Sequence, residues 1–96
     1  MINIIEISDL KKIKEEINII DIRDEYSFEK GHIKNAKNIV ENKLLLNPQK
    51  YLKKEEIYYI YCTNGYRSKQ VVKHLKILGY NAINIKGGYN NYLLSK

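Results

Sequence analysis

Two β-branched segments constrain the fold of this chain more than any other feature. Residues 17–23 read INIIDIR and residues 57–61 read IYYIY, and both are nearly continuous runs of strand-forming side chains. Such runs are typical of strands that are buried on both faces of a parallel sheet. Segments with helical spacing of apolar residues lie between and after them. The sequence therefore predicts an α/β domain around a mostly parallel sheet.

The rest of the chain continues the alternation of strands and helices. Further strands are expected at residues 2–7, 36–40 and 81–85. Two helices are expected to begin at a capping residue: one runs from Ser8 or Asp9 to about residue 16, and one from Ser68 to about residue 78. Short helices are expected at 26–30 and from Gly87-Gly88 to residue 94. Residues 42–56 are expected to form a loose helical stretch that Pro48 interrupts. Right-handed crossovers would join the parallel strands.

Length and charge limit the possible functions. The chain has 96 residues, which predicts one domain over residues 1–96. Its formal net charge is +6, but the lysines occur singly or in pairs instead of in a long basic run. A solvated surface is the favoured interpretation, and no nucleic-acid partner is expected. The positive charge would still concentrate a small anionic substrate near the protein.

The cysteine count and the apolar pattern indicate a cytoplasmic protein. A single cysteine cannot form an internal disulfide, so the fold does not depend on an oxidising compartment. The first residues lack the basic-then-apolar pattern of a signal peptide. No apolar run reaches the length of a membrane span, so no membrane association is expected.

The single cysteine stands where α/β folds place their ligands. Cys62 follows the predicted strand 57–61 and precedes a loop and a helix. In open α/β sheets the ligand site lies at the carboxyl ends of the strands. Loop amides can converge there as a nest of N–H donors, and the helix dipole adds partial positive charge. Both stabilise a thiolate, which is the nucleophilic form of cysteine.

Two other residues of the loop fit this interpretation. Arg67 adds a permanent positive charge and a planar fork of donors, which suits the thiolate or the oxygens of an anionic substrate. Gly65 allows the backbone to curve tightly. The alternative is that Cys62 is a buried apolar cysteine, as free cysteines usually are. Its position at the junction of strand and loop favours the nucleophile.

Asp21 and Arg23 lie at the end of the strand that is expected beside the Cys62 strand. They could form a supporting layer around the site. The other interpretation is an ion pair or a backbone-bonded brace at a strand end, and this is favoured over direct catalysis.

Three motifs resemble those of single-domain rhodaneses. Residues 62–68, CTNGYRS, resemble the C-x-x-G-x-R-S active-site loop of that family. Residues 21–39 contain D-x-R followed by G-H-I-x-x-A-x-N-I, and residues 78–92 contain L-G-Y followed by I-x-G-G and an aromatic residue. The motifs occur in family order over almost the whole chain. The departures from the family pattern lie outside the loop, at Ser27, Asn35, Val40 and Tyr92.

The resemblance implies a rhodanese-like three-layer sandwich, with a mostly parallel sheet of about five strands and helices on both faces. It also implies a thiosulfate sulfurtransferase-like mechanism. Cys62 would attack the outer sulfur of a small anionic donor such as thiosulfate, release sulfite and become a persulfide. The loop amides would hold the anion, with Arg67 as the favoured substrate contact; the loop residues are Thr63, Asn64, Gly65, Tyr66, Arg67 and Ser68. No metal and no cofactor are required.

The acceptor of the sulfur must come from outside the chain. Because there is no second cysteine, no resolving thiol is available within the protein. An external thiol, a persulfide-accepting protein or, in the test tube, cyanide would take the sulfur from Cys62.

Two rival functions stay open at this level. Related cysteine-dependent phosphatases have five residues between cysteine and arginine, and arsenate reductase chemistry is of a similar kind. Here four residues separate Cys62 from Arg67, and the smaller loop suits a persulfide sulfur better than a phosphate. The second rival is a non-catalytic interaction module with the rhodanese fold. Such modules commonly lack the nucleophile, whereas this chain retains it.

Overall fold

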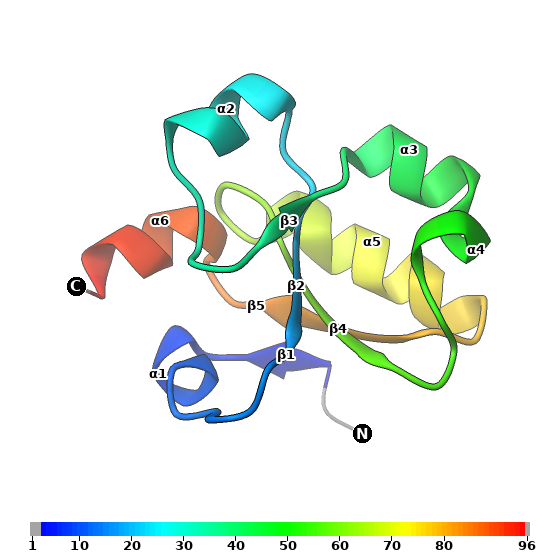
Figure 1. Cartoon of the computed structure of the whole chain (residues 1–96), viewed down its shortest axis with the longest axis horizontal. Helices are drawn as coiled ribbons and strands as arrows, with labels where there is room; N and C mark the ends of the chain where they lie inside the picture. The colour runs from blue at the N-terminus through cyan, green and yellow to red at the C-terminus, as the bar shows by residue number, and fades with distance from the viewer. Residues whose placement is uncertain (1–2, 96) are drawn as a thin grey trace.

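Strands and helices alternate along residues 3–95, the part of the chain that the computed structural model describes (Figure 1). The strands are β1 (Ile4–Ile5), β2 (Asn18–Asp21), β3 (Lys37–Asn38), β4 (Ile57–Tyr61) and β5 (Asn81–Ile85). The helices are α1 (Ile7–Leu10), α2 (Glu25–Lys30), α3 (Glu41–Leu46), α4 (Pro48–Tyr51), α5 (Tyr66–Ile77) and α6 (Gly88–Leu94).

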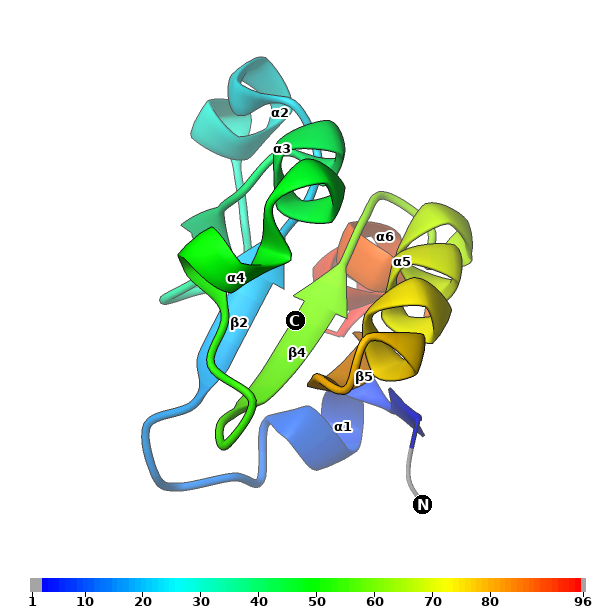
Figure 2. The same ribbon diagram turned by 90° about the vertical axis from the view of Figure 1, so that its right-hand side faces the viewer.

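The strands form one sheet in the order β1-β5-β4-β2-β3, and every described pair is parallel. The two β-branched segments of the sequence provide β2 and β4, which lie side by side with Asp21 opposite Tyr61. In Figure 2 the arrows of β2 and β4 both point towards α2, α3 and the loop before α5. The carboxyl ends of these strands therefore meet at one edge of the sheet.

Helices cover both faces of the sheet. On one face, α3 and α5 contribute Leu44, Val71 and Leu75 to a core that also contains Ile60 of β4. On the other face, α1 and α6 pack on a second cluster; its buried members are Ile7, Leu10, Ile19, Ile33, Tyr61 and Ile85. Strand β4 is the central strand of the sheet and supplies side chains to both clusters. The predicted three-layer α/β sandwich with five strands is confirmed.

The first helix is shorter than the sequence pattern predicts. It was expected to continue to about residue 16, but α1 ends at Leu10 and is followed by turns. Ile7 and Leu10 are buried in the helix, and Ile13 packs against the same cluster from the turn that follows. Residues 14–16 are polar and exposed, so continuing the helix through them would add no apolar contact. The expected cap at Ser8 or Asp9 is also wrong, because the N-cap position is Glu6. Of the first strand expected at 2–7, Ile2 lies outside the described residues.

The segment expected as a loose helix over 42–56 contains two short helices. Pro48 begins α4 and separates it from α3, as the sequence predicts. After Leu52 the chain forms a turn rather than continuing the helix, which places Lys53 next to the hydroxyl of Tyr58. A second correction concerns α5: its N-cap is Gly65 and not Ser68, which lies within the first turn of the helix.

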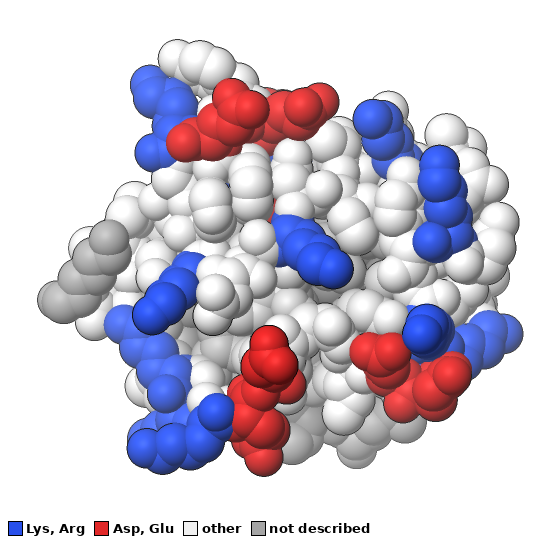
Figure 3. Space-filling model, viewed as in Figure 1, with Lys and Arg blue, Asp and Glu red and all other residues white. Residues whose placement is uncertain are grey.

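The surface carries charges of both signs. On the face shown in Figure 3, basic side chains lie in separate groups with acidic groups between them. Acidic side chains gather near α2 at the top of this view. No helix within residues 3–95 has both the length and the apolar character needed to cross a membrane.

Candidate active site

Cys62 lies at the carboxyl end of β4, where it is 5% exposed. Its sulfur accepts hydrogen bonds from the backbone amides of Gly65 at 3.2 Å and of Ser68 at 3.3 Å. Both donors belong to the start of α5, a helix of 12 residues. The sulfur therefore faces partial positive charge from the helix end as well as from two N–H groups.

The loop curls around the sulfur because its residues favour a tight turn. Gly65 has φ +89°, a left-handed conformation that side chains disfavour. A Cβ atom at Gly65 would also lie 2.8 Å from the amide nitrogen of Gly87. Asn64 accepts a hydrogen bond from the amide of Tyr66 at 3.0 Å through its side-chain oxygen. Thus the first amide of α5 is satisfied within the loop.

The start of α6 holds the other side of the loop. The amides of Tyr89 and Asn90 donate to the carbonyl oxygens of Cys62 and Thr63 at 2.9 and 3.0 Å. Since these carbonyls are engaged away from the sulfur, the loop can present N–H groups to it. Gly88 permits this contact, because a Cβ atom there would overlap the carbonyl oxygen of Cys62. Gly88 therefore lets the start of α6 pack directly against the loop.

Behind the sulfur lies a buried chain of side-chain hydrogen bonds. The Cys62 thiol donates to the hydroxyl of Ser68 at 3.3 Å, and that hydroxyl donates to the amide oxygen of Asn84 at 2.5 Å. Asn84 is 3% exposed and its NH₂ group donates to the carbonyl of Gly65 at 3.2 Å. The side chain of Asn84, on β5, therefore fixes both the hydroxyl of Ser68 and the turn at Gly65.

Arg67 lies on the outer side of the loop and is paired with Glu41. Its Nε donates to one carboxylate oxygen of Glu41 at 3.1 Å and its Nη2 donates to the other at 2.8 Å. These bonds, together with the charge of Glu41, raise the pKa of Arg67. The guanidinium is thus held beside the site by a two-point contact.

Asp21 and Arg23 form a buried ion pair at the end of β2. The Arg23 guanidinium contacts the Asp21 carboxylate at 2.7 Å and donates to the carbonyl of Gly31 at 2.6 Å. Burial alone would lower the pKa of Arg23, but the bond to Asp21 and its charge offset this and raise it. The pKa of Tyr61, on the neighbouring strand, is raised above its ordinary value of 10. The main cause is burial of the hydroxyl, and the second is its hydrogen bond with Asp21.

A hollow of about 390 Å³ opens in front of Cys62. It is lined by Ile22, Arg23, Asp24, Ser27, Glu41, Cys62, Thr63, Asn64 and Arg67. The segment just after β2, the loop after β4 and the starts of α2, α3 and α5 all contribute to its wall. The size suits a small molecule or the end of a flexible side chain, and the nucleophile lies in its lining.

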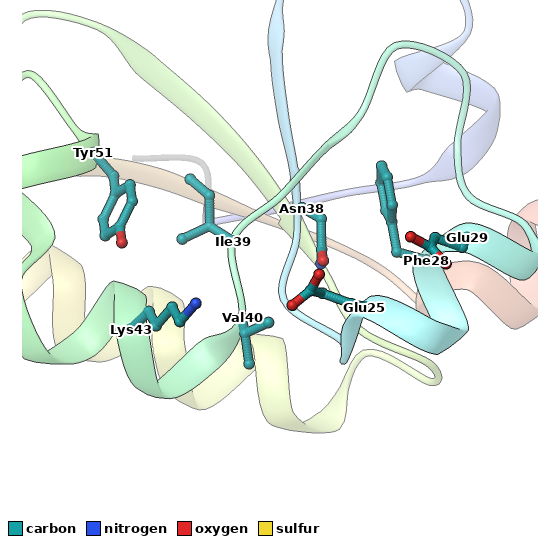
Figure 4. A pocket seen from close by; sticks show the side chains of 8 residues that line it. All are labelled: Glu25, Phe28, Glu29, Asn38, Ile39, Val40, Lys43 and Tyr51. Atoms are coloured by element: carbon teal, nitrogen blue, oxygen red, sulfur yellow. The ribbon is translucent and has the colours of Figure 1, made fainter.

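A second hollow of similar size lies along another face of α2 (Figure 4). Glu25, Phe28 and Glu29 line one end of it, and Lys43 and Tyr51 line the other. Its lining includes no cysteine, serine or histidine that could attack a substrate. The chemistry of the sequence motifs therefore belongs to the hollow at Cys62.

The structure brings most of the predicted site residues together. Cys62, Thr63, Asn64 and Arg67 line the same hollow as Arg23. Gly65 and Ser68 lie beneath the sulfur and donate to it, and Asp21 is buried behind Arg23. Tyr66 points outward and is 67% exposed, away from the hollow.

Two residues of the site were missed at the level of sequence. Asn84 interrupts an otherwise apolar segment, Ala82–Ile85, and a polar residue in a buried strand is a signal that could have identified it. Glu41 offers no such signal, because it lies 26 residues from Arg67 in the chain and an acidic residue at a helix start is common.

The family model for the rhodanese-like domain matches residues 6–95. The chain belongs to the rhodanese-like family. Among its relatives is a protein of Coxiella burnetii named thiosulfate sulfurtransferase GlpE, which is 34% identical over 80 residues, or 82% of this chain and 74% of that protein. The putative sulfurtransferase YtwF of Bacillus subtilis is 33% identical over 76 residues, or 77% of this rhodanese-like chain and 71% of YtwF.

Solved structures agree with the fold of this rhodanese-like domain. A rhodanese-like domain protein from Staphylococcus aureus superposes with a TM-score of 0.84 at 33% identity, covering 96% of this chain and 91% of the other. The human single-domain sulfurtransferase TSTD1 superposes with a TM-score of 0.86 at 22% identity, covering 97% and 96% of the two chains. The likeness to TSTD1 concerns the fold alone.

Proposed function

We propose that this protein is a sulfurtransferase that carries sulfane sulfur as a persulfide on Cys62. The observation that carries the proposal is the cradle of Cys62: its sulfur accepts two backbone amides at the start of α5 and lies in the wall of an open hollow. Amide donors stabilise a sulfur anion, and a hollow of this size admits a small donor. The named sulfurtransferases among the relatives support the same reaction class.

In the first half-reaction the Cys62 thiolate attacks the outer sulfur of the donor. For thiosulfate, a bond forms between Sγ and the outer sulfur, the bond between the two sulfurs of thiosulfate breaks, and its electron pair leaves with sulfite. The products are the Cys62 persulfide anion and sulfite, so charge and atoms balance. The amides of Gly65 and Ser68 hold the sulfur in place. The amide of Tyr66 is bound by the side chain of Asn64, so the amides of Thr63, Asn64 and Arg67 would surround the outer sulfur.

In the second half-reaction an external thiol takes the sulfur. The acceptor sulfur bonds to the outer sulfur of the persulfide, the bond to Sγ breaks, and its electron pair returns to Cys62 as thiolate. The acceptor leaves as a persulfide and keeps the proton of its thiol. A reducing compartment such as the cytoplasm suits this step, because external thiols are abundant there and a lone cysteine stays reduced.

Arg23 lines the hollow and Asp21 is buried behind it. The ion pair between them fixes the segment just after β2, which forms part of the wall. Arg67 is the candidate contact for the oxygens of an anionic donor, since its guanidinium borders the same hollow.

Turnover of thiosulfate and cyanide to thiocyanate tests the proposal. The wild-type protein is expected to form thiocyanate, and Cys62→Ser is expected to form none above the uncatalysed background. A parallel assay with an aryl phosphate distinguishes the phosphatase alternative. Hydrolysis of the phosphate without formation of thiocyanate would overturn the sulfurtransferase proposal.

A further inference from the structure

The carboxylate of Glu41 is already bound to the guanidinium of Arg67, which is the cation that a small anionic donor would need. Both oxygens of Glu41 accept from the Arg67 guanidinium, at 3.1 and 2.8 Å, and both residues line the hollow at Cys62. A donor oxygen that binds Arg67 must therefore compete with a two-point carboxylate contact that is already formed.

Glu41 is the fixed partner of this pair. Its backbone amide donates to the carbonyl of Ile22 at 3.1 Å, just after β2, so the start of α3 is tied to the sheet. The side chain of Glu41 is 25% exposed, whereas that of Arg67 is 69% exposed. The pair consequently holds the exposed side chain of Arg67 towards α3.

The charges around the hollow do not add up to a receptor for a dianion. Arg23 is neutralised by Asp21 at 2.7 Å and Arg67 by Glu41 at 2.8 Å. Asp24 adds a further negative charge to the wall. Hydrogen bonds from the amide and hydroxyl of Ser27 hold it ionised, and the amide bond is the main cause of its lowered pKa. Three carboxylates, of Asp21, Asp24 and Glu41, therefore stand against two guanidinium groups, and their net charge of −1 repels a dianion more strongly than a monoanion.

We propose that Glu41 is a specificity-determining residue, which disfavours inorganic dianions and favours sulfur donors that carry one negative charge or none, such as a persulfide on a carrier thiol. The proposal rests on the sulfurtransferase function proposed above and names its class of donor. Glu41 acts by occupying Arg67 and by its own charge at the mouth. It takes no part in the bond-making steps.

A pair of donors with the same outer sulfur and different charge tests this. Thiosulfate carries two negative charges and releases sulfite, whereas methanethiosulfonate carries one and releases methanesulfinate. Both are assayed with cyanide as acceptor at constant ionic strength, because salt screens such effects. Glu41→Gln is expected to lower the KM for thiosulfate about fivefold and that for methanethiosulfonate about twofold, because Coulomb energy scales with the donor charge.

Two further variants make the test specific. Glu55→Gln removes the same charge from an exposed residue just before β4, at the opposite end of the sheet, and is expected to leave both KM values unchanged. Glu41→Gln is also made in a protein that carries Arg67→Gln. There it is expected to change the logarithm of the KM for thiosulfate by at most half as much as in the wild type, because no Arg67 guanidinium can be released.

The outcomes separate the two proposals. The wild type and Glu41→Gln could turn over both donors with the same ratio of the KM for thiosulfate to the KM for methanethiosulfonate. That result would overturn the role of Glu41 and leave the sulfurtransferase function standing. An undiminished effect of Glu41→Gln without Arg67 would also overturn it as stated. If the wild type turned over neither donor, the sulfurtransferase function itself would fall, and this proposal with it.

Discussion

The backbone amide of Ser68 donates to the sulfur of Cys62 at 3.3 Å, although Ser68 already lies within the first turn of α5. The sulfur is thus placed close to the start of the helix, with the loop folded back around it. This arrangement depends on contacts made by α6 and β5, elements that follow the loop by about twenty residues. The chemistry of one cysteine is therefore linked to the packing of residues 81–94, near the end of the sequence.

Replacing Gly88 tests the contact between α6 and the loop. Gly88→Ala adds a Cβ atom that overlaps the carbonyl oxygen of Cys62, at a residue whose φ is +57°. Gly79→Ala is the matched control: its φ is +95°, but the nearest atom to a new Cβ is the flexible Lys54 Nζ at 3.5 Å. We expect Gly79→Ala to lower the free energy of unfolding by about 1–2 kcal/mol and Gly88→Ala by a further ~1–3 kcal/mol.

Urea denaturation followed by circular dichroism measures both costs. Gly88→Ala should also slow persulfide formation, because the carbonyl of Cys62 can no longer stay in its present position. Equal stability losses in the two variants would show that the contact with Cys62 has no energetic weight.

Replacing Asn84 tests the buried hydrogen-bond chain. Asn84→Ala leaves the carbonyl of Gly65 and the hydroxyl of Ser68 without the partner they have now, so we expect a loss of about 1–3 kcal/mol in unfolding free energy. The control is Asn81→Ala on the same strand, where an exposed amide donates to the carbonyl of Lys54. That loss should stay within about 0.5 kcal/mol. A similar loss of unfolding free energy in both variants would show that the buried hydrogen bonds of Asn84 add no stability beyond that of an exposed one.

Much of the fold follows from the sequence, for a physical reason. The segments that became β2 and β4 are buried on both faces, and double burial is what makes an apolar run continuous. The position of Cys62 at the end of β4 could be predicted because it depends on chain order alone. The loop around it was predicted in outline from the glycine at position 65.

The parts that could not be predicted depend on tertiary contacts. The length of α1 is decided by how much of it can be buried against the sheet, which local spacing does not reveal. Ser68 has the side chain of a helix cap, but its hydroxyl is used by Asn84 instead. The partner of Arg67 comes from α3, and nothing near Arg67 in the sequence indicates it.

Burial of Tyr61 predicts a pH dependence of stability. The pKa of Tyr61 is raised in the folded state, so above about pH 10 the unfolded chain loses a proton that the folded chain retains. The contribution of Tyr61 is therefore fully present below pH 10 and decreases as pH rises further. Between pH 9 and pH 11 the wild type should lose about 1.4 kcal/mol more than Tyr61→Phe, and the difference in slope should approach about 1.4 kcal/mol per pH unit only at the upper end of this range. Parallel slopes from urea denaturation between pH 9 and pH 11 would contradict this.

The central claim is that Cys62 carries sulfur, and the most direct measurement is the intact mass of the protein after incubation with a sulfane donor. Reduced protein is treated with methanethiosulfonate or thiosulfate, freed of donor and weighed. We expect a gain of one sulfur atom that a thiol reductant removes and that Cys62→Ser does not show. The reductant step is needed because sulfinic acid adds nearly the same mass but is not reversed by thiols. An unchanged mass with both donors, or a gain that Cys62→Ser retains, would contradict the account.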